Sequence, residues 1–505
     1  MLFNSYEFIL SFLPVVLAGF LVLGGLGKRL GVLIWLILAS FWFLGSWRVA
    51  DLLILIGSIL SNYAIGRAIV FYREQPLGKV LLGIGVAGNL ALIGYFKYSA
   101  FIMSNLAEAT GMALSIPKVA LPLAISFYTF QQIAFLVDAR KGLFVKTGFV
   151  DYCFFVGFFP QLIAGPLVNF RSVHDQIESA GTFRPDVEKM AFGLAIFVVG
   201  LAKKVLIADT VAPTADTIFG AAAAGDVLTM FEAWGGAIAY TLQLYFDFSG
   251  YSDMAIGLGM MFGIRLPINF NSPYKATSIV DFWRRWHMTL SAFLRNYLYI
   301  GLGGNRKGPV RRYVNLFITM LLGGLWHGAA WTFVVWGALH GIYLIICHAW
   351  RHLTGSDGTA STGWALTWFY RCLTLLAVVV GWVYFRAADL NVAHSILGSM
   401  FGANGVDLPA RLSSLGSSLR WLGVGFRPSP HLPSVEVMAW MAVLTGAVLF
   451  APNTQQIFRY LPDRLARRRL RGLAAHPAVP LALGVVFVVA LSQMSAIQVF
   501  LYFNF

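Results

Sequence analysis

The chain has 505 residues, of which 58% are hydrophobic and only 12% are charged. This composition excludes a soluble globular protein and favours a polytopic membrane protein, because a soluble surface needs far more polar groups. The formal net charge of +15 would suggest nucleic-acid binding in a soluble protein, but in a membrane protein it is explained by basic loops that face the anionic cytoplasmic leaflet. We therefore expect membrane lipid as a partner, and no nucleic acid.

Apolar runs recur at regular intervals in the first part of the chain. The first run ends before Lys28 and Arg29 and lacks the basic start of a cleavable signal peptide, so we expect an uncleaved helix whose N-terminus lies outside. Basic clusters then follow alternate runs, as the positive-inside rule predicts. The runs that approach the ~20 residues needed to cross a bilayer cover residues 31–46, 51–71, 80–96 and 119–137.

The next apolar segments are irregular. Residues 153–170 are broken by Pro160, Gly165 and Pro166, and residues 248–263 are short and rich in glycine. Non-helical backbone at membrane depth survives only where protein or a cavity satisfies its polar groups, so we predict that both segments are re-entrant or interrupted. Between them we expect helices over residues 190–207 and 228–246, separated by an acidic, alanine-rich outer loop that contains Asp209, Asp216 and Asp226.

Residues 264–313 are rich in lysine and arginine and contain a single acid, Asp281, which indicates a cytoplasmic loop. A second basic loop is expected over residues 452–478, and the parity of the crossings then places residues 389–433 outside. We predict a single all-α membrane domain over residues 1–505 with about 11–12 transmembrane helices. Its later apolar runs cover residues 313–325, 329–350, 364–385, 435–450 and 478–500.

The cysteines point to no special chemistry. Cys153, Cys347 and Cys372 lie in apolar runs and lack metal-ligand spacing. Since a free cysteine often packs as a small apolar residue, we expect neither a disulfide framework nor a metal site.

Aromatic residues alternate with arginines in residues 281–291, at a spacing that suits a helix. Such a helix can lie in the membrane interface, with its rings at the acyl boundary and its arginines on phosphate groups or on an anionic donor. The simpler interpretation is an interfacial anchor, and both interpretations stay open. The candidate donor-binding residues are Trp283, Arg284, Arg285, Trp286 and His287.

The glycine-rich segment 301–308 resembles a phosphate-binding loop but lacks the strand and the spacing of a P-loop. A tight turn is therefore the favoured interpretation. Its backbone amides, together with Arg306 and Lys307, are nevertheless able to meet an anion. We keep Asn305 and Arg306 as candidates for the donor site.

Two carboxylates lie in the apolar tract 245–253. Asp247 and Asp253, with Ser249 between them, need partners if they are buried, and the nearby arginines are candidates. Structural ion pairing is favoured over direct catalysis, and the three residues are kept as candidates for lining a tunnel.

The sharpest chemical signal is His327, which lies between Trp326 and Gly328 at an expected helix break in an apolar tract. A titratable side chain at membrane depth usually faces a protein interior or a water-filled cavity and marks a functional site. A neutral imidazole is a competent base at neutral pH, and the adjacent glycine permits close approach of a substrate. Catalysis by His327 is therefore favoured over a structural role.

A second histidine, His340, follows thirteen positions later. Along a straight helix at 1.5 Å per residue it lies about 20 Å from His327. The two imidazoles should then not share one proton-transfer step unless the helix bends. For His340 a catalytic role and a structural or tunnel-lining role are about equally supported.

Several motifs together make the chain resemble the alginate O-acetyltransferase branch of the membrane-bound O-acyltransferases. The resemblance runs along the whole chain, and the set of motifs is far more specific than any one of them. The motifs are FPQLIAGP at 159–166, FDFSGYSDMA at 246–255, DFWRRWHMTLS at 281–291, YLYI at 297–300, GGNR at 303–306 and WHGA at 326–329.

The resemblance implies a ring of helices with re-entrant segments around a central tunnel in the bacterial inner membrane. It also implies that His327 is the essential histidine of the family and that His340 is its second recurrent one. The expected donor is a cytoplasmic acetyl thioester, most simply acetyl-CoA, and an acyl carrier protein is the alternative. The expected acceptor is an extracytoplasmic polysaccharide, alginate or a similar exopolysaccharide, reached through a periplasmic partner of the SGNH type.

Other functions remain open at this point. D-alanyl transfer from a carrier protein to a cell-envelope polymer uses the same fold. A transporter or flippase for a lipid-linked sugar would be expected to show two related halves, of which the sequence gives no sign. A scaffold without activity is disfavoured because the Trp326-His327-Gly328 motif is intact.

Overall fold

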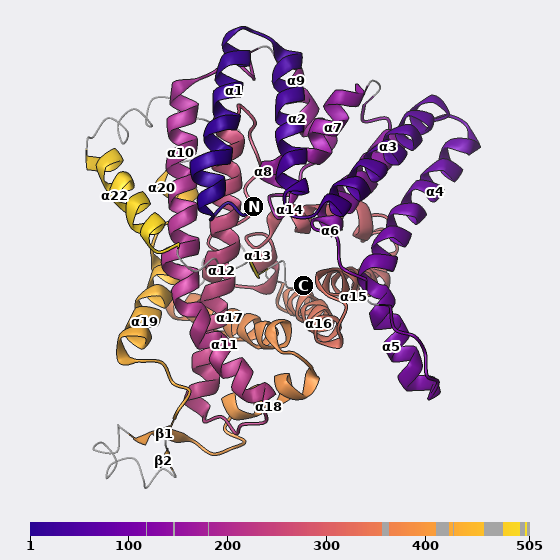
Figure 1. The fold of residues 1–505 in the computed structure, drawn as a ribbon. Helices are drawn as coiled ribbons and strands as arrows, with labels where there is room; N and C mark the ends of the chain where they lie inside the picture. Colours follow the sequence, from indigo (N-terminus) through magenta and orange to yellow (C-terminus); the bar gives the residue numbers. More distant parts are fainter. Residues whose placement is uncertain are drawn as a thin grey trace. The chain divides into compact units, whose positions relative to one another are not determined.

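The computed structural model describes residues 1–117, 119–144, 147–179, 181–355, 363–410, 424–427, 429–458, 478–494 and 500–501. In these ranges nearly all regular structure is helical, which confirms the predicted all-α class (Figure 1). The chain divides into two compact units. Unit 1 comprises Met1–Ala202, Ser249–Asn269 and Thr454–Asn504, and unit 2 comprises Lys203–Phe248, Phe270–Asn453 and Phe505.

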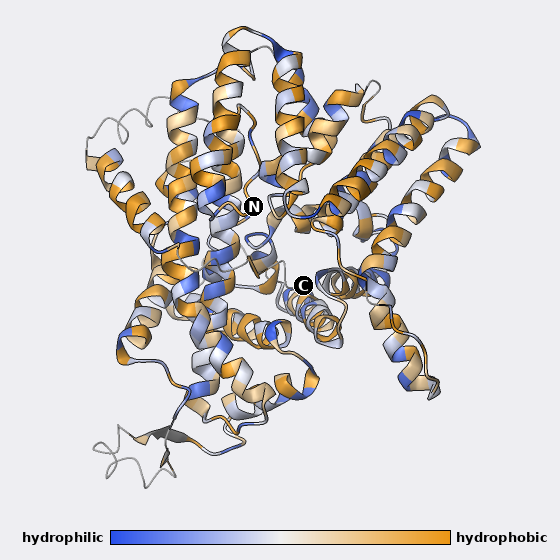
Figure 2. Cartoon of the chain, viewed as in Figure 1, coloured by the Kyte–Doolittle hydropathy of each residue, from blue (hydrophilic) through white to orange (hydrophobic). Residues whose placement is uncertain are grey.

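Long apolar helices confirm a multi-pass membrane protein. Within the described ranges, six helical stretches are long and apolar enough to cross a membrane, and Figure 2 shows the hydrophobic residues that run along them. These stretches are Glu7–Gly25, Val49–Phe71, Pro76–Thr110, Val187–Ala223, Trp331–Thr354 and Trp364–Arg386, and shorter apolar helices cover Arg29–Gly45, Val435–Phe450 and Ala478–Ser492.

Unit 1 holds the N-terminal helices. The predicted apolar runs fall on helices here, except that the helix expected over residues 119–137 begins only at Ile125, after Ala124 in the left-handed conformation. The elements of unit 1 before α12 are η1 (Glu7–Phe12), α1 (Leu13–Gly25), α2 (Arg29–Gly45), α3 (Val49–Phe71), α4 (Pro76–Ile93), η2 (Gly94–Tyr98), α5 (Ser99–Thr110), α6 (Ile125–Arg140), α7 (Phe149–Gly157), α8 (Phe159–Leu162), α9 (Phe170–Glu178) and α10 (Val187–Ala202).

The predicted interruption of residues 153–170 is confirmed. The helix stops at Gly157, restarts for one turn as α8, and is followed by a turn and irregular backbone up to Asn169. A side chain at Gly165 would overlap the backbone of Gln161, with its Cβ 2.5 Å from that Cα, so glycine is required there. The Asn169 side chain accepts a hydrogen bond from the Ser172 backbone N–H and thereby starts α9.

The prediction that residues 248–263 are interrupted is wrong. Residues 248–261 belong to α12 (Met230–Met261), a continuous helix of 32 residues. The glycines here bring helices together, because a Cβ on Gly257 would lie 2.4 Å from the carbonyl oxygen of Gly193, and a Cβ on Gly200 would lie 2.6 Å from that of Gly250. Small residues allow membrane helices to pack with their backbones in contact.

Unit 2 contains the remaining elements of the described chain apart from α20 (Thr454–Ile457) and α22 (Ala478–Ser492), which belong to unit 1. Besides the first part of α12, these are η3 (Lys203–Ala208), α11 (Asp209–Ala223), η4 (Pro273–Lys275), α13 (Ile279–Trp283), α14 (Met288–Phe293), η5 (Leu294–Tyr299), α15 (Gly308–His327), α16 (Trp331–Thr354), α17 (Trp364–Arg386), α18 (Leu390–Met400), β1 (Asp407–Pro409), β2 (Gly425–Arg427) and α19 (Val435–Phe450).

The predicted acidic outer loop is also wrong in part, because Asp209 and Asp216 lie within the helix α11. Each carboxylate has a basic partner, since Asp209 pairs with Lys204 at 2.7 Å and Asp216 pairs with Arg386 at 2.7 Å. These basic partners neutralise the two carboxylates, so Asp209 and Asp216 can lie in a helix and do not require a loop. Asp226 does lie beyond the end of this helix.

The region 389–433 holds α18 and a short parallel pair of strands, in which Leu408 is in register with Phe426. Most of the second basic loop, residues 459–477 of the predicted 452–478, lies outside the described residues.

Candidate active site

His327 is the last residue of α15, and Trp331 is the first residue of α16. The two helices are packed along each other, and a Cβ on Gly324 would lie 2.8 Å from the Cα of Gly337. Gly328 has φ −160°, which any residue adopts, but its Cβ would lie 2.1 Å from the ring of Phe333. The absence of a side chain at Gly328 therefore makes room for an aromatic ring.

The expected separation of about 20 Å between the two histidines is wrong, because the chain turns between α15 and α16 and does not continue as one helix. The ring of Trp336 lies between them, with its centroid 5.1 Å from that of His327 and 4.8 Å from that of His340. Both imidazoles are buried. The two histidines therefore belong to one site.

His340 has a defined hydrogen-bond partner on one side. The indole Nε1 of Trp283 donates to the Nδ1 of His340 at 3.3 Å. This contact brings a residue of the predicted donor-binding segment to the second histidine. The ring of Trp283 also lies 5.8 Å from that of Trp336.

The prediction of a single continuous helix over residues 281–291 is wrong. α13 ends at Trp283, and α14 begins at Met288 after His287, which has the left-handed backbone conformation φ 42°, ψ 52°. Trp283, Trp286 and His287 are buried within unit 2, where their rings pack against other rings. Arg284 is exposed, and Arg285 pairs with Asp281 at 2.9 Å.

His287 lies beside the predicted base. Its ring centroid is 6.4 Å from that of His327 and 4.8 Å from that of Phe248. The side chain is fully buried. Three histidines therefore lie in one aromatic cluster of unit 2, which we define as Phe282, Trp283, Trp286, His287, Trp326, His327, Trp336, His340, Trp382 and Phe385.

The carboxylates of the tract 245–253 have local partners. Asp247 lies 2.8 Å from the Nζ of Lys204, a buried lysine that also binds Asp209. Asp253 accepts hydrogen bonds from the side chains of Thr454 at 2.7 Å and Gln455 at 3.0 Å. Lys204 is thus a partner of Asp247, whereas the sequence suggested arginines. Ser249 is buried in unit 1.

The glycine-rich segment forms a tight turn. Gly303, Gly304 and Gly308 have φ values of 108°, 58° and 85°, which favour glycine. Asn305 and Arg306 are exposed on this turn, whereas the aromatic cluster is buried. The structure thus brings Trp283, Trp286, His287, Trp326, His327 and His340 together and leaves Asn305 and Arg306 at the surface.

A group of arginines meets at the other ends of α15 and α16. Arg312 donates to the Nδ1 of His348 at 2.8 Å, and Arg284 and Arg351 also interact electrostatically with that ring. Arg351 donates to the hydroxyl of Ser278 at 3.2 Å. In the described part of the chain none of the three arginines forms an ion pair with a carboxylate. Guanidinium groups without acidic partners suit a phosphate ligand.

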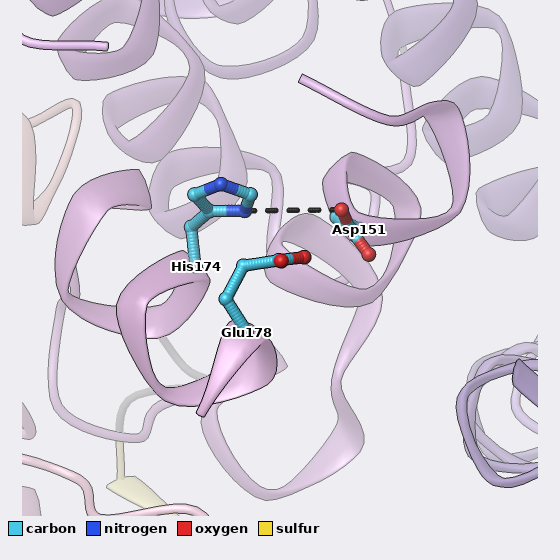
Figure 3. A group of neighbouring side chains, drawn as sticks. All are labelled: Asp151, His174 and Glu178. Atoms are coloured by element: carbon cyan, nitrogen blue, oxygen red, sulfur yellow. Dashed lines mark ion pairs between the residues drawn. The ribbon is translucent and has the colours of Figure 1, made fainter. Parts of the chain in front are cut away.

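One group of side chains in the described residues has the composition of a metal site. Figure 3 shows Asp151 of α7 beside His174 and Glu178 of α9, whose ligand atoms all lie within 4.8 Å of one another. Arg29 donates to Glu178 at 2.5 Å and lowers the pKa of that carboxyl, while burial raises the pKa of Asp151. Because a guanidinium already compensates this group, we interpret it as an ion-pair cluster.

Comparison with known proteins identifies the class. The family model described as MBOAT, the membrane-bound O-acyltransferase family, matches residues 123–385. This match includes the aromatic cluster and the turn between α15 and α16. The chain belongs to this family and is a membrane O-acyltransferase.

Individual relatives cover most of the chain. It is 42% identical over 436 residues to the peptidoglycan O-acetyltransferase of Helicobacter pylori, covering 81% of each chain. It is 41% identical over 481 residues to the probable alginate O-acetylase AlgI of Pseudomonas putida, covering 89% of this chain and 95% of the relative. The teichoic acid D-alanyltransferase of Streptococcus thermophilus is 28% identical over 45% of this chain and 57% of its own length.

Reasoning from the sequence missed Trp336, Trp382 and Phe385, whose rings complete the cluster. Trp336 precedes His340 by four positions in a helix, so the two share one helix face. That spacing was a usable signal. Nothing in the sequence alone places α17, which carries the other two rings, beside α15.

Proposed function

We propose that this protein transfers an acetyl group from a cytoplasmic thioester, acetyl-CoA, to a hydroxyl of an extracytoplasmic polysaccharide at the bacterial inner membrane. Alginate or a similar exopolysaccharide is the acceptor, and a periplasmic SGNH-type protein delivers the group to the polymer. The names of the relatives that cover most of this chain support acetyl as the transferred group. The weaker and shorter match to a D-alanyltransferase gives less support to that rival.

The observation that carries the proposal is the burial of His327 among aromatic rings. Its side chain is 4% exposed, and rings of Trp326, Trp336 and Phe385 lie within 5.1 Å of its own, centroid to centroid. Such surroundings exclude water, so a thioester held there is protected from hydrolysis. A neutral imidazole in this setting can act as a base.

The reaction then proceeds by acyl transfer. The acceptor hydroxyl gives its proton to His327 as its oxygen forms a bond to the acyl carbon. The bond from carbon to sulfur breaks, and the thiolate takes the proton from the imidazole. Base catalysis of this type contributes roughly 10²–10⁴-fold to the rate.

The test uses purified protein in liposomes with radiolabelled acetyl-CoA, the SGNH partner and the polymer. We expect label to enter alginate, with transfer abolished by His327→Ala while the protein remains folded and inserted. Incorporation that persists in this variant would contradict the role of His327. If incorporation of the label requires a charged carrier protein, that protein replaces acetyl-CoA as the proposed donor. If the label enters only peptidoglycan, peptidoglycan replaces alginate as the proposed acceptor.

The arginines around His348 suggest a binding site for the phosphate groups of acetyl-CoA. If they bind its phosphate groups, Arg312→Gln or Arg351→Gln should raise the KM for acetyl-CoA roughly 10-fold, since a hydrogen bond to a charged group contributes about 1.5–3 kcal/mol. The value of kcat should change little. Arg311→Gln, an exposed neighbour of Arg312, is the matched control and should behave as wild type. Equal KM values in all three variants would place the donor elsewhere.

A further inference from the structure

His340 and Trp336 of the aromatic cluster each have a buried ring nitrogen without a hydrogen-bond partner in the described part of the chain. The side chains of His340 and Trp336 are 0% and 1% exposed. Within the described residues, neither the Nε2 of His340 nor the Nε1 of Trp336 has a hydrogen-bond partner. Leaving a polar group buried and unpaired costs about 1–3 kcal/mol, so such a pair in an enzyme points to an acceptor that comes from outside the chain.

The hydrogen-bond pattern makes the Nε2 of His340 a donor. Trp283 donates its indole proton to the Nδ1 of His340, and a nitrogen that accepts a hydrogen bond carries no proton of its own. A neutral imidazole has one proton. That proton is therefore on Nε2, the atom for which the described residues offer no acceptor.

Both donors face Gly381 on α17. A Cβ at this position would lie 3.0 Å from the Nε2 of His340 and 3.5 Å from the Nε1 of Trp336. Gly381 lies inside α17, where alanine would be favoured over glycine by about 1 kcal/mol. Its backbone is not in the left-handed region that demands glycine. A side chain at Gly381 would therefore lie over both N–H groups.

From this geometry we propose that His340 and Trp336 bind the carbonyl oxygen of the thioester and stabilise the oxyanion that forms on it. The inference rests on the proposed function. The ring of Trp336 lies 5.1 Å from that of His327, so an acyl group on these donors is adjacent to the base.

This assignment separates the roles of the histidines. When the acceptor oxygen attacks the acyl carbon, the electron pair of the carbonyl double bond moves onto its oxygen. The two N–H groups stabilise that charge and give up no proton. Collapse of the adduct restores the carbonyl and expels the thiolate, which takes the proton held by His327. His340 is in this account a catalytic hydrogen-bond donor and not a second base.

Variants of the two donors test the kinetic consequence. Trp336→Phe keeps the ring and removes the N–H, and we expect kcat to fall about 10²–10³-fold, as for loss of a donor in other oxyanion sites, with the KM for acetyl-CoA nearly unchanged. His340→Ala should lose as much, and His340→Gln, which keeps an N–H near the same place, should recover part of it. Trp331→Phe, an exposed tryptophan of the same helix, should be unaffected.

Gly381→Ala places a methyl group over both donors and should reduce kcat as strongly as their removal. Gly323→Ala is the matched control, because its buried Cβ would meet only a terminal methyl of Leu294 at 3.2 Å. We expect the control to retain near wild-type kcat. Full activity in Gly381→Ala and Trp336→Phe would overturn the inference.

Infrared spectroscopy separates failure of this inference from failure of the proposed function. In His327→Ala, which cannot turn over, the carbonyl band of bound ¹³C-labelled acetyl-CoA should shift to lower frequency. Adding Trp336→Phe or Gly381→Ala should remove that shift while binding persists. If acetyl-CoA binds but its carbonyl band does not shift, this inference is overturned and the proposed function is not. Absence of saturable acetyl-CoA binding would overturn acetyl-CoA as the donor and, with it, this inference.

Discussion

His287 shows how a single backbone conformation places a functional ring. Its φ of 42° is in the left-handed region, which costs a non-glycine residue about 1–2 kcal/mol. His287 is the residue directly before α14, and its ring lies 6.4 Å from that of His327. Strained residues persist where the surrounding structure holds them, and they gather at functional sites.

We therefore predict that His287→Asn remains folded but transfers acetyl groups at least 10-fold more slowly. Asparagine tolerates the left-handed conformation, so the turn is kept while the imidazole is lost. Thermal unfolding in detergent and transfer in liposomes measure the two effects on the same preparation. His287→Ala should unfold at a lower temperature than His287→Asn, because alanine lacks this tolerance. Unchanged transfer in His287→Asn would mean that the ring only fills space.

The sequence was informative about residues whose chemistry is unusual for their surroundings. The position of two histidines in an apolar tract was sufficient to select His327 and His340 as candidates, and the resemblance to a known family then supported both. Trp336 offers only its spacing of four positions from His340, and Gly381 offers no signal, because a tryptophan and a glycine are ordinary in membrane helices. The two unpaired N–H groups beside Gly381, within the described residues, are found only once α16 and α17 are packed.

At the scale of elements, long apolar runs were predicted well. The helix expected over residues 435–450 has those bounds in the structure, and the helix expected over 364–385 ends one residue later. Errors arose where a neighbouring element decides the conformation. The glycines in residues 248–263 suggested a break, but they form packing surfaces of α12. The acids that suggested an outer loop are paired side chains on α11.

The contact between α10 and α12 gives a prediction at this scale. Gly257→Ala should lower the unfolding temperature, since its Cβ would lie 2.4 Å from the carbonyl oxygen of Gly193 and force the helices apart. Gly57→Ala on α3 is the matched control, because its exposed Cβ meets nothing within 4 Å. That control should be neutral or stabilised by up to about 1 kcal/mol. Thermal unfolding of both variants in one detergent checks the opposite signs, and equal shifts would contradict the assigned contact.

For the whole molecule, the distribution of charge predicts its orientation. The basic residues of 264–313 should face the cytoplasm, and the region around Asp226 should face outward. This orientation decides the direction of acetyl transfer, because it puts Arg312 and Arg351, at the ends of α15 and α16 remote from His327, on the side where acetyl-CoA is made.

Single cysteines introduced into a chain whose native cysteines have been replaced test this orientation. Ala224 and Asn305 are both exposed and lie outside the long apolar stretches. In cells whose outer membrane alone is permeabilised, a maleimide that cannot cross the inner membrane should label Ala224→Cys. The same reagent should label Asn305→Cys only in inverted vesicles. The opposite pattern would put the arginines outside, away from any cytoplasmic thioester. It would then follow that His327 draws its acyl group from an exported donor, so the direction of labelling decides between two directions of transfer through the same site.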